Sequence, residues 1–116
     1  MISGLHTIVY AQDAARAREF LRDVLGLGWV DAGDGWLVFA APPTEVAVHP
    51  TDAASSGRAE LYLMCDDVTA TVAALTAKGV EFTSPVADRG WGLVTSLRVP
   101  GAGEIGLYEP RHPTAL

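Results

Sequence analysis

The sequence has little cysteine, few basic residues and no long hydrophobic run. Among its 116 residues Cys65 is the single cysteine, so an internal disulfide is excluded. Lysine and arginine number 8 against 14 acidic residues, and the net charge of −6 leaves no basic stripe for a phosphate backbone. No apolar stretch approaches the roughly 20 residues of a membrane span, and the first residues lack a secretion signal's basic and apolar regions. We therefore expect a cytoplasmic protein without nucleic-acid or membrane partners.

What the chain does contain is an internal repeat. The composition of the whole chain, 49% hydrophobic and 19% charged, is that of one globular domain covering residues 1–116. Residues 5–13 and 59–67 each read as a short apolar strand, and each ends on an aspartate that can cap a helix. After both aspartates apolar residues recur at helical spacing until a glycine follows. Both halves thus begin with a strand and a helix.

Three more strands are predicted after each helix. The matching segments are 27–32 with 80–85, 34–41 with 89–96, and 45–50 with 104–110. The predicted fold class is α+β, with two tandem βαβββ modules whose bare sheet faces curve together around a cavity. The predicted parts are module one (about 4–50), a small polar linker (about 51–58), module two (about 59–111) and a C-terminal tail (112–116).

The motifs of this doubled unit also indicate a family. They are "HTIVYAQDAARAREFLRDVLGLGW", "CDDVTATVAALTAKGVEF" and "GEIGLYEP", and together they extend over roughly residues 4–111. The arrangement resembles the vicinal oxygen chelate superfamily, which includes glyoxalase I, extradiol dioxygenases, and bleomycin and fosfomycin resistance proteins. The resemblance implies the glyoxalase/bleomycin resistance fold and, since many relatives pair two chains, a homodimer. One fold hosts many chemistries, so the function has to be argued from the site.

In metal-dependent members the resemblance implies one ligand on the first strand and one glutamate on the last strand of each module. The first-strand positions are His6 and Glu60 here, and both side chains can bind a metal. The last-strand positions are Ala47 and Gly106, which have no group to coordinate an ion. A catalytic divalent ion normally takes at least three protein ligands, so the resemblance does not extend to a complete metal site.

Two carboxylates leave a metal-dependent alternative open. Glu45 and Glu104 lie two residues before Ala47 and Gly106, on the same strand faces. Two residues along a strand span about 6.6 Å, so the ion or the strand register would have to shift. Both glutamates also adjoin turns, where a solvated carboxylate is the ordinary expectation.

His6 and Glu60 are the candidates for catalysis. A histidine exchanges protons near neutral pH, and a buried glutamate can act as a general base. The alternatives are a half-buried, hydrogen-bonded histidine and an exposed carboxylate beside Arg58.

Alternation along the strands predicts a cavity lined by aromatic, apolar and a few polar side chains. Trp91 joins this lining because glycines flank it and, by the resemblance, its loop borders the cavity. For His49 an exposed turn residue is favoured over a pocket group. His112 is expected in a disordered tail, and Cys65 is expected to be a buried, inert thiol. The ligand-binding candidates are Tyr10, His49, Tyr62, Met64, Trp91 and Tyr108.

Two hypotheses of function follow. The first is a protein that binds or sequesters a small organic ligand, such as an antibiotic or a metabolite, with no cofactor. The second is a lyase, isomerase or dioxygenase that uses a divalent ion (Zn, Ni, Mn or Fe) on His6 and Glu60, or these two residues as acid and base. A subunit that only scaffolds a partner is the third and least favoured reading, because the lining is polar enough to form a site.

Overall fold

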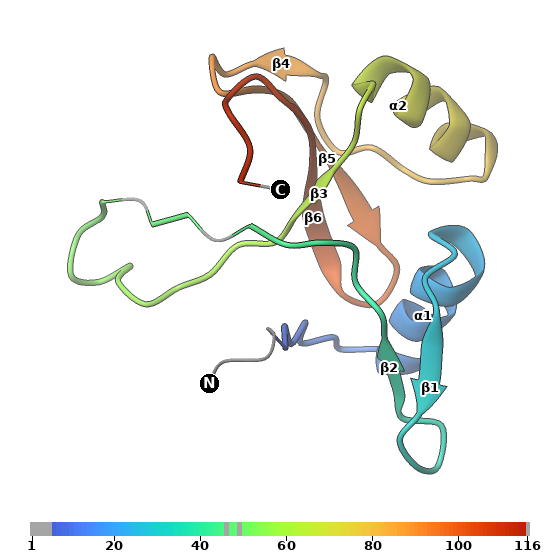
Figure 1. Cartoon of the computed structure of the whole chain (residues 1–116). Helices are drawn as coiled ribbons and strands as arrows, with labels where there is room; N and C mark the ends of the chain where they lie inside the picture. Colours follow the sequence, from blue (N-terminus) through green and yellow to red (C-terminus); the bar gives the residue numbers. More distant parts are fainter. Residues whose placement is uncertain (1–5, 46, 49, 116) are drawn as a thin grey trace.

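The computed structural model describes residues 6–45, 47–48 and 50–115 (Figure 1). In chain order its elements are α1 (Ala14–Glu19), the π-helical turn η1 (Phe20–Val24), β1 (Trp29–Asp31), β2 (Leu37–Phe39), β3 (Tyr62–Met64), α2 (Val68–Ala77), β4 (Ala87–Asp88), β5 (Gly92–Val99) and β6 (Gly103–Pro110). None of the described helices is long and apolar enough to cross a membrane.

The second half of the chain forms the predicted βαβββ module. Its four strands lie in the order β3-β6-β5-β4, with β3 parallel to β6 and the other pairs antiparallel. The predicted strand at 80–85 is only partly formed, through one bridge between Phe82 and Leu97. Pro85 has no N–H to donate to a ladder, and the regular pairing with β5 resumes at β4.

Both helices begin where the sequence predicts. The carboxylate of Asp13 accepts the backbone N–H of Arg16 at 3.1 Å at the start of α1. Asp67 accepts the N–H of Ala70 at 3.0 Å at the start of α2. Each bond satisfies one of the amide groups that a first helical turn leaves without a partner. After α2 the chain leaves the helix at Gly79, whose φ of +87° favours glycine.

The hydrophobic core lies between the four-stranded sheet and the two helices. Leu97 of β5 and Val68 of α2 are fully buried, and Phe20 of η1 packs into the same cluster. In Figure 1 both helices lie on one side of the sheet, and residues 111–115 curl back on the other. A backbone hydrogen bond of 3.0 Å from Asp13 to Gly101 ties the start of α1 to the β5–β6 turn. The buried core residues are Ala17, Phe20, Val68, Val80, Leu97, Val99, Ile105 and Leu107.

The first half of the chain is less complete than its repeat. Its strands β1 and β2 pair with each other as an antiparallel hairpin. The strands predicted at 5–13 and 45–50 are absent from the described parts of those segments. The described residues of these two segments make no strand pairing, and a segment without backbone pairing does not form a strand. Several large apolar side chains of this half are consequently 63–94% exposed: Ile8, Tyr10, Val30, Trp36 and Val48.

Candidate functional site

The face of the four-stranded sheet that carries no helix presents the candidate site. Strand alternation places Tyr62 and Met64 of β3 on this open face, and Leu63 between them packs against the core. In β6, Gly106 and Tyr108 alternate in the same way with core residues. The predicted division between the helix face and the open face is therefore the observed one for these strands.

Three aromatic rings form a cluster on the open face, which we call the aromatic cluster: Tyr62, Trp91 and Tyr108. The ring centroid of Tyr62 lies 5.9 Å from that of Trp91 and 5.9 Å from that of Tyr108, with interplanar angles of 89° and 85°. Trp91 and Tyr108 are 5.1 Å apart at 66°. These edge-to-face contacts are the favourable geometry for aromatic quadrupoles, and they leave ring faces available for a further group.

Two strand glycines make room for these tyrosines. A Cβ on Gly106 would lie 2.9 Å from Cγ of Tyr62 and closer still to two other ring atoms. A Cβ on Gly92 would lie 2.8 Å from Cδ2 of Tyr108. The rings therefore lie across the backbone of neighbouring strands at points where only glycine fits. Gly106, which interrupts an otherwise regular strand sequence, is explained by the ring of Tyr62.

Polar groups adjoin the rim of the aromatic cluster. The hydroxyl of Tyr62 donates to Glu60 at 3.2 Å, and Arg58 pairs with the same carboxylate at 3.4 Å. Burial, then the charge of Glu60 and this hydrogen bond, raise the pKa of Tyr62. Burial and the charge of Glu45 likewise raise the pKa of Tyr108. Both phenols therefore stay protonated, and able to donate, throughout the physiological range.

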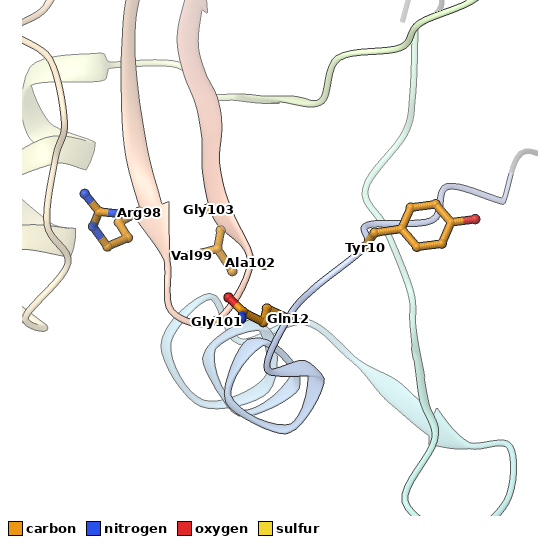
Figure 2. A pocket seen from close by; sticks show the side chains of 7 residues that line it. All are labelled: Tyr10, Gln12, Arg98, Val99, Gly101, Ala102 and Gly103. Atoms are coloured by element: carbon orange, nitrogen blue, oxygen red, sulfur yellow. The ribbon is translucent and has the colours of Figure 1, made fainter.

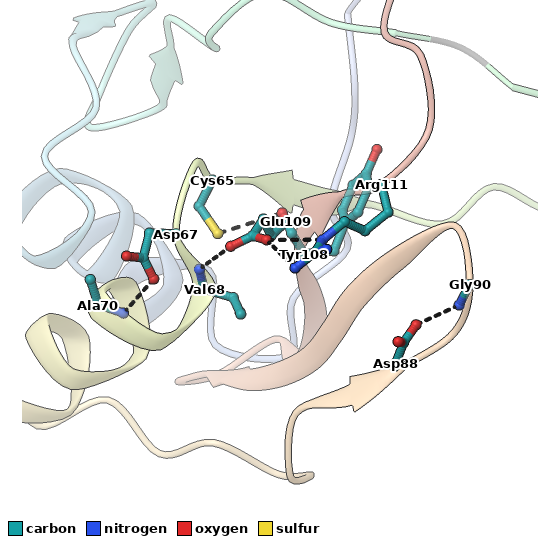
Figure 3. Close-up of polar contacts among 9 residues, drawn as sticks. All are labelled: Cys65, Asp67, Val68, Ala70, Asp88, Gly90, Tyr108, Glu109 and Arg111. Carbon is teal, nitrogen blue, oxygen red and sulfur yellow. Dashed lines mark hydrogen bonds and ion pairs between the residues drawn. The ribbon is translucent and has the colours of Figure 1, made fainter.

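The C-terminal residue His112, for which the sequence predicts a disordered tail, lies against the aromatic cluster. The imidazole of His112 lies 5.9 Å from the ring of Tyr108 at an angle of 24°, and its Nε2 is 3.2 Å from the tyrosine hydroxyl. Figure 3 shows Glu109 between the N–H of Val68 (3.2 Å) and the guanidinium of Arg111 (3.1 Å). Sequence alone does not reveal the contact of His112 with Tyr108, because it does not show that Glu109 pairs with Arg111.

The remaining site predictions fall outside the aromatic cluster. His6 is exposed and lies outside the strands, and His49 is not among the described residues. Tyr10 is 86% exposed and borders a separate open hollow of about 410 Å³ at the β5–β6 turn (Figure 2). Met64 is half-buried and pairs in register with Tyr108.

The possible metal ligands do not gather in the described part of the chain. Ala47 and Glu104 are exposed, and Glu104 lies opposite Arg98 in the sheet register. Within residues 6–45, 47–48 and 50–115, no three His, Cys, Asp or Glu side chains form a group that could hold an ion. Cys65 lies on the helix face, where burial raises the pKa of its thiol and makes it a poor nucleophile.

Comparison with known proteins matches the chain to one family. The model of the Glyoxalase/Bleomycin resistance protein/Dioxygenase superfamily matches residues 5–110. Among solved structures, TnmS3, an antibiotic binding protein from Streptomyces sp. CB03234, is 28% identical, with a TM-score of 0.67 and coverage of 94% of this chain and 97% of that one.

Two further solved structures share the fold. A lactoylglutathione lyase from Agrobacterium tumefaciens is 19% identical, with a TM-score of 0.66 and 92% of each chain covered. A glyoxalase/bleomycin resistance protein/dioxygenase from Nocardioides is 19% identical, with a TM-score of 0.65 and coverage of 100% of this chain and 92% of that one. No curated protein gives a significant match.

Proposed function

The chain belongs to the Glyoxalase/Bleomycin resistance protein/Dioxygenase superfamily, and on that premise we propose that it binds a small organic molecule on its aromatic cluster without a metal ion. The observation that carries the proposal is the exposure of this cluster. Tyr62 and Trp91 remain 39% and 41% exposed around the buried Tyr108. Aromatic surface with a few polar groups at its rim is typical of a small-molecule site.

The donor set on the open face does not suit a divalent ion. At the position of Gly106 a glutamate would have to occupy the space that the ring of Tyr62 fills. Glu60 is already engaged by Arg58 and by the hydroxyl of Tyr62. With Ala47 at the matching place of the first module, two of the four family positions have no donor. These features support a binding protein over the metal-dependent enzyme.

The similarity to TnmS3 supports the same class of function. That protein is described as antibiotic binding, and its similarity to this chain covers nearly the full length of both. We therefore propose an antibiotic or a comparable aromatic metabolite as the ligand, bound or sequestered without reaction. A cytoplasmic location stays a prediction from the single cysteine.

The test is a binding titration with Trp91 as the reporter. A Trp29→Phe/Trp36→Phe protein retains Trp91 as its one tryptophan, and its fluorescence is titrated in EDTA with flat aromatic antibiotics and metabolites. The proposal expects saturable quenching by at least one of these compounds. It also expects Tyr108→Ala to weaken that binding about tenfold or more, since an aromatic contact is lost together with buried area. Binding that Tyr108→Ala leaves unchanged would contradict the proposed site.

The metal-dependent alternative has its own test. Protein without a histidine tag is dialysed against excess Zn, Ni, Mn or Fe(II), and the bound metal per chain is measured. One ion per chain that disappears in His6→Ala would overturn the metal-free proposal. We expect substoichiometric metal that His6→Ala does not change.

We further propose that two copies of the chain form a homodimer. The accessible area of the chain is 8439 Å², whereas a compact protein of 12.2 kDa exposes about 6,100 Å². The excess of roughly 2,300 Å² per chain has the size of an obligate interface. The exposed apolar side chains Ile8, Trp36 and Val48 contribute to this excess area. Strands of a second copy would extend the two-stranded sheet of the first half. The ligand would then lie between the aromatic cluster of one chain and module one of the other.

A further inference from the structure

The C-terminal residues 111–115, which we call the C-terminal segment, lie against the aromatic cluster without helix or strand structure. The backbone N–H of Arg111 donates to the carbonyl of Trp91 at 2.9 Å, which anchors the start of the segment. At its far end the N–H of Ala115 donates to the carboxylate of Glu45. The segment is therefore fastened at both ends, with His112 between them.

The imidazole of His112 lies nearly parallel to the ring of Tyr108, whereas the other aromatic contacts among the described residues are edge-to-face. Tyr62 and Trp91 meet Tyr108 at 85° and 66°, whereas His112 lies at 24° to it. Between these three rings Tyr108 is only 8% exposed, although it stands on the open face of the sheet. The imidazole thus occupies a stacking position that a flat ring of a ligand would otherwise take.

The hydrogen bonds of His112 determine which ring nitrogen carries the hydrogen and which accepts. Its Nδ1 is 2.8 Å from the carbonyl oxygen of Pro113, which can only accept, so Nδ1 carries the hydrogen. In the neutral imidazole Nε2 is then an acceptor, and the hydroxyl of Tyr108 donates to it across 3.2 Å. His112 therefore presents to Tyr108 a flat aromatic ring with one hydrogen-bond acceptor.

From these contacts we infer that the C-terminal segment is an internal competitor of the ligand, and that the ligand is a flat aromatic or heteroaromatic compound with a carbonyl oxygen or ring nitrogen facing Tyr108. On binding, the ligand ring replaces His112 over Tyr108 and accepts the hydrogen bond of its hydroxyl. This inference rests on the proposed function, because it concerns the regulation and ligand class of the same aromatic cluster.

Opening the segment disturbs little of the folded protein. Residues 111, 113, 114 and 115 are exposed, and His112 is half-buried. The core between the sheet and the helices contains none of these residues. Segments held by a few exposed hydrogen bonds open at low free-energy cost compared with global unfolding. A binding site that is covered most of the time lowers the apparent affinity by the fraction of molecules that are open.

The test uses acridone, a flat three-ring carbonyl compound, and carbazole, a flat three-ring compound without an acceptor. The dissociation constant of acridone is measured for the unmodified protein, for His112→Ala and for the control Thr114→Ala, which changes an exposed neighbour. If the segment is closed nine times in ten, His112→Ala binds acridone about tenfold more tightly. Thr114→Ala binds it as the unmodified protein does, and carbazole binds several-fold more weakly than acridone.

A second readout follows the segment itself by NMR. In the free protein the ring current of Tyr108 shifts the imidazole protons of His112, and acridone returns them toward the values of an unstructured histidine. If His112→Ala leaves the affinity for acridone unchanged or weakens it, the competition is overturned while the proposed function stands. Equal affinity for carbazole overturns the need for an acceptor. If neither compound binds to any variant, the ligand class is wrong, and the antibiotic titration above decides the proposed function separately.

Discussion

At the scale of single residues, the pairing of Tyr62 with Gly106 decides what the site can hold. The tyrosine ring lies over the backbone where a family metal ligand would project, so one contact both removes a donor and adds an aromatic surface. Gly92 likewise leaves room for the ring of Tyr108. The sequence identifies Gly106 as unusual, but it does not reveal which side chain needs the space.

Replacing Gly106 tests this pairing. Gly106→Ala is expected to lower the free energy of unfolding by about 1–3 kcal/mol, because the new methyl group meets the ring of Tyr62. In a Tyr62→Ala background the same substitution should cost less than half as much, as a double-mutant cycle in urea would measure. Gly28→Ala is the matched control, because its Cβ would meet its nearest neighbour at 3.9 Å. An equal cost of Gly106→Ala in both backgrounds would contradict the pairing.

The tyrosines of the cluster also predict a pH dependence. Burial raises the pKa of Tyr62 and Tyr108 above the ordinary value, so the folded protein keeps these protons while the unfolded chain loses them. The free energy of unfolding should therefore be unaffected by them below about pH 10 and fall as the pH rises beyond it. Urea titrations between pH 8 and about 11.5 should show a smaller fall for Tyr108→Phe. A fall in Tyr108→Phe as large as in the unmodified protein would refute the assignment.

At the scale of elements, the sequence predicts local features such as helix starts and strand faces, but it does not predict which strands pair. Asp13 and Asp67 predict the helix starts because a cap acts within one turn. Alternation predicts the faces of β3 and β6 because both strands find partners inside the same module. The strand expected at 5–13 has the same kind of sequence as 59–67, yet the described residues of this segment pair with no other strand. The periodicity of a segment predicts its own conformation, but it does not predict which strand the segment pairs with.

The cap of α2 provides a prediction at this scale. Asp67→Ala removes the acceptor for the N–H of Ala70 and should lower the free energy of unfolding by about 1 kcal/mol. Asp66→Ala, which removes an exposed adjacent carboxylate, should change it by less than about 0.5 kcal/mol. The two variants are compared by thermal and urea denaturation. Equal losses would show that the net charge, and not the cap, is responsible.

At the scale of the whole molecule, the single chain is more extended than a compact domain. Its radius of gyration is 15.1 Å, against about 13 Å for a compact chain of 116 residues. In Figure 1 residues 50–58, drawn in green before β3, project far from the sheet. The repeat in the sequence predicts two similar modules, but it does not determine whether they close within one chain or between two.

Sedimentation equilibrium tests the homodimer. We expect a mass of twice 12.2 kDa at micromolar concentration. Ile8→Asp/Val48→Asp places charges in the exposed apolar surface of the first half and should shift the protein toward the monomer. Ala53→Asp adds a charge in the predicted linker and should leave the dimer intact. A monomer in the unmodified protein, or a dimer in all variants, would contradict this assembly.

Metal-free ligand binding on the aromatic cluster is tested by the tryptophan indole region of a proton–nitrogen NMR spectrum, recorded in EDTA during an acridone titration. The protein has three tryptophans, and Trp91 alone among them belongs to the aromatic cluster. We expect the indole signal of Trp91 to move most, and to move in the absence of any divalent ion. A spectrum in which Trp91 stays still while acridone binds, or in which binding appears only after a divalent metal is added, would contradict this expectation.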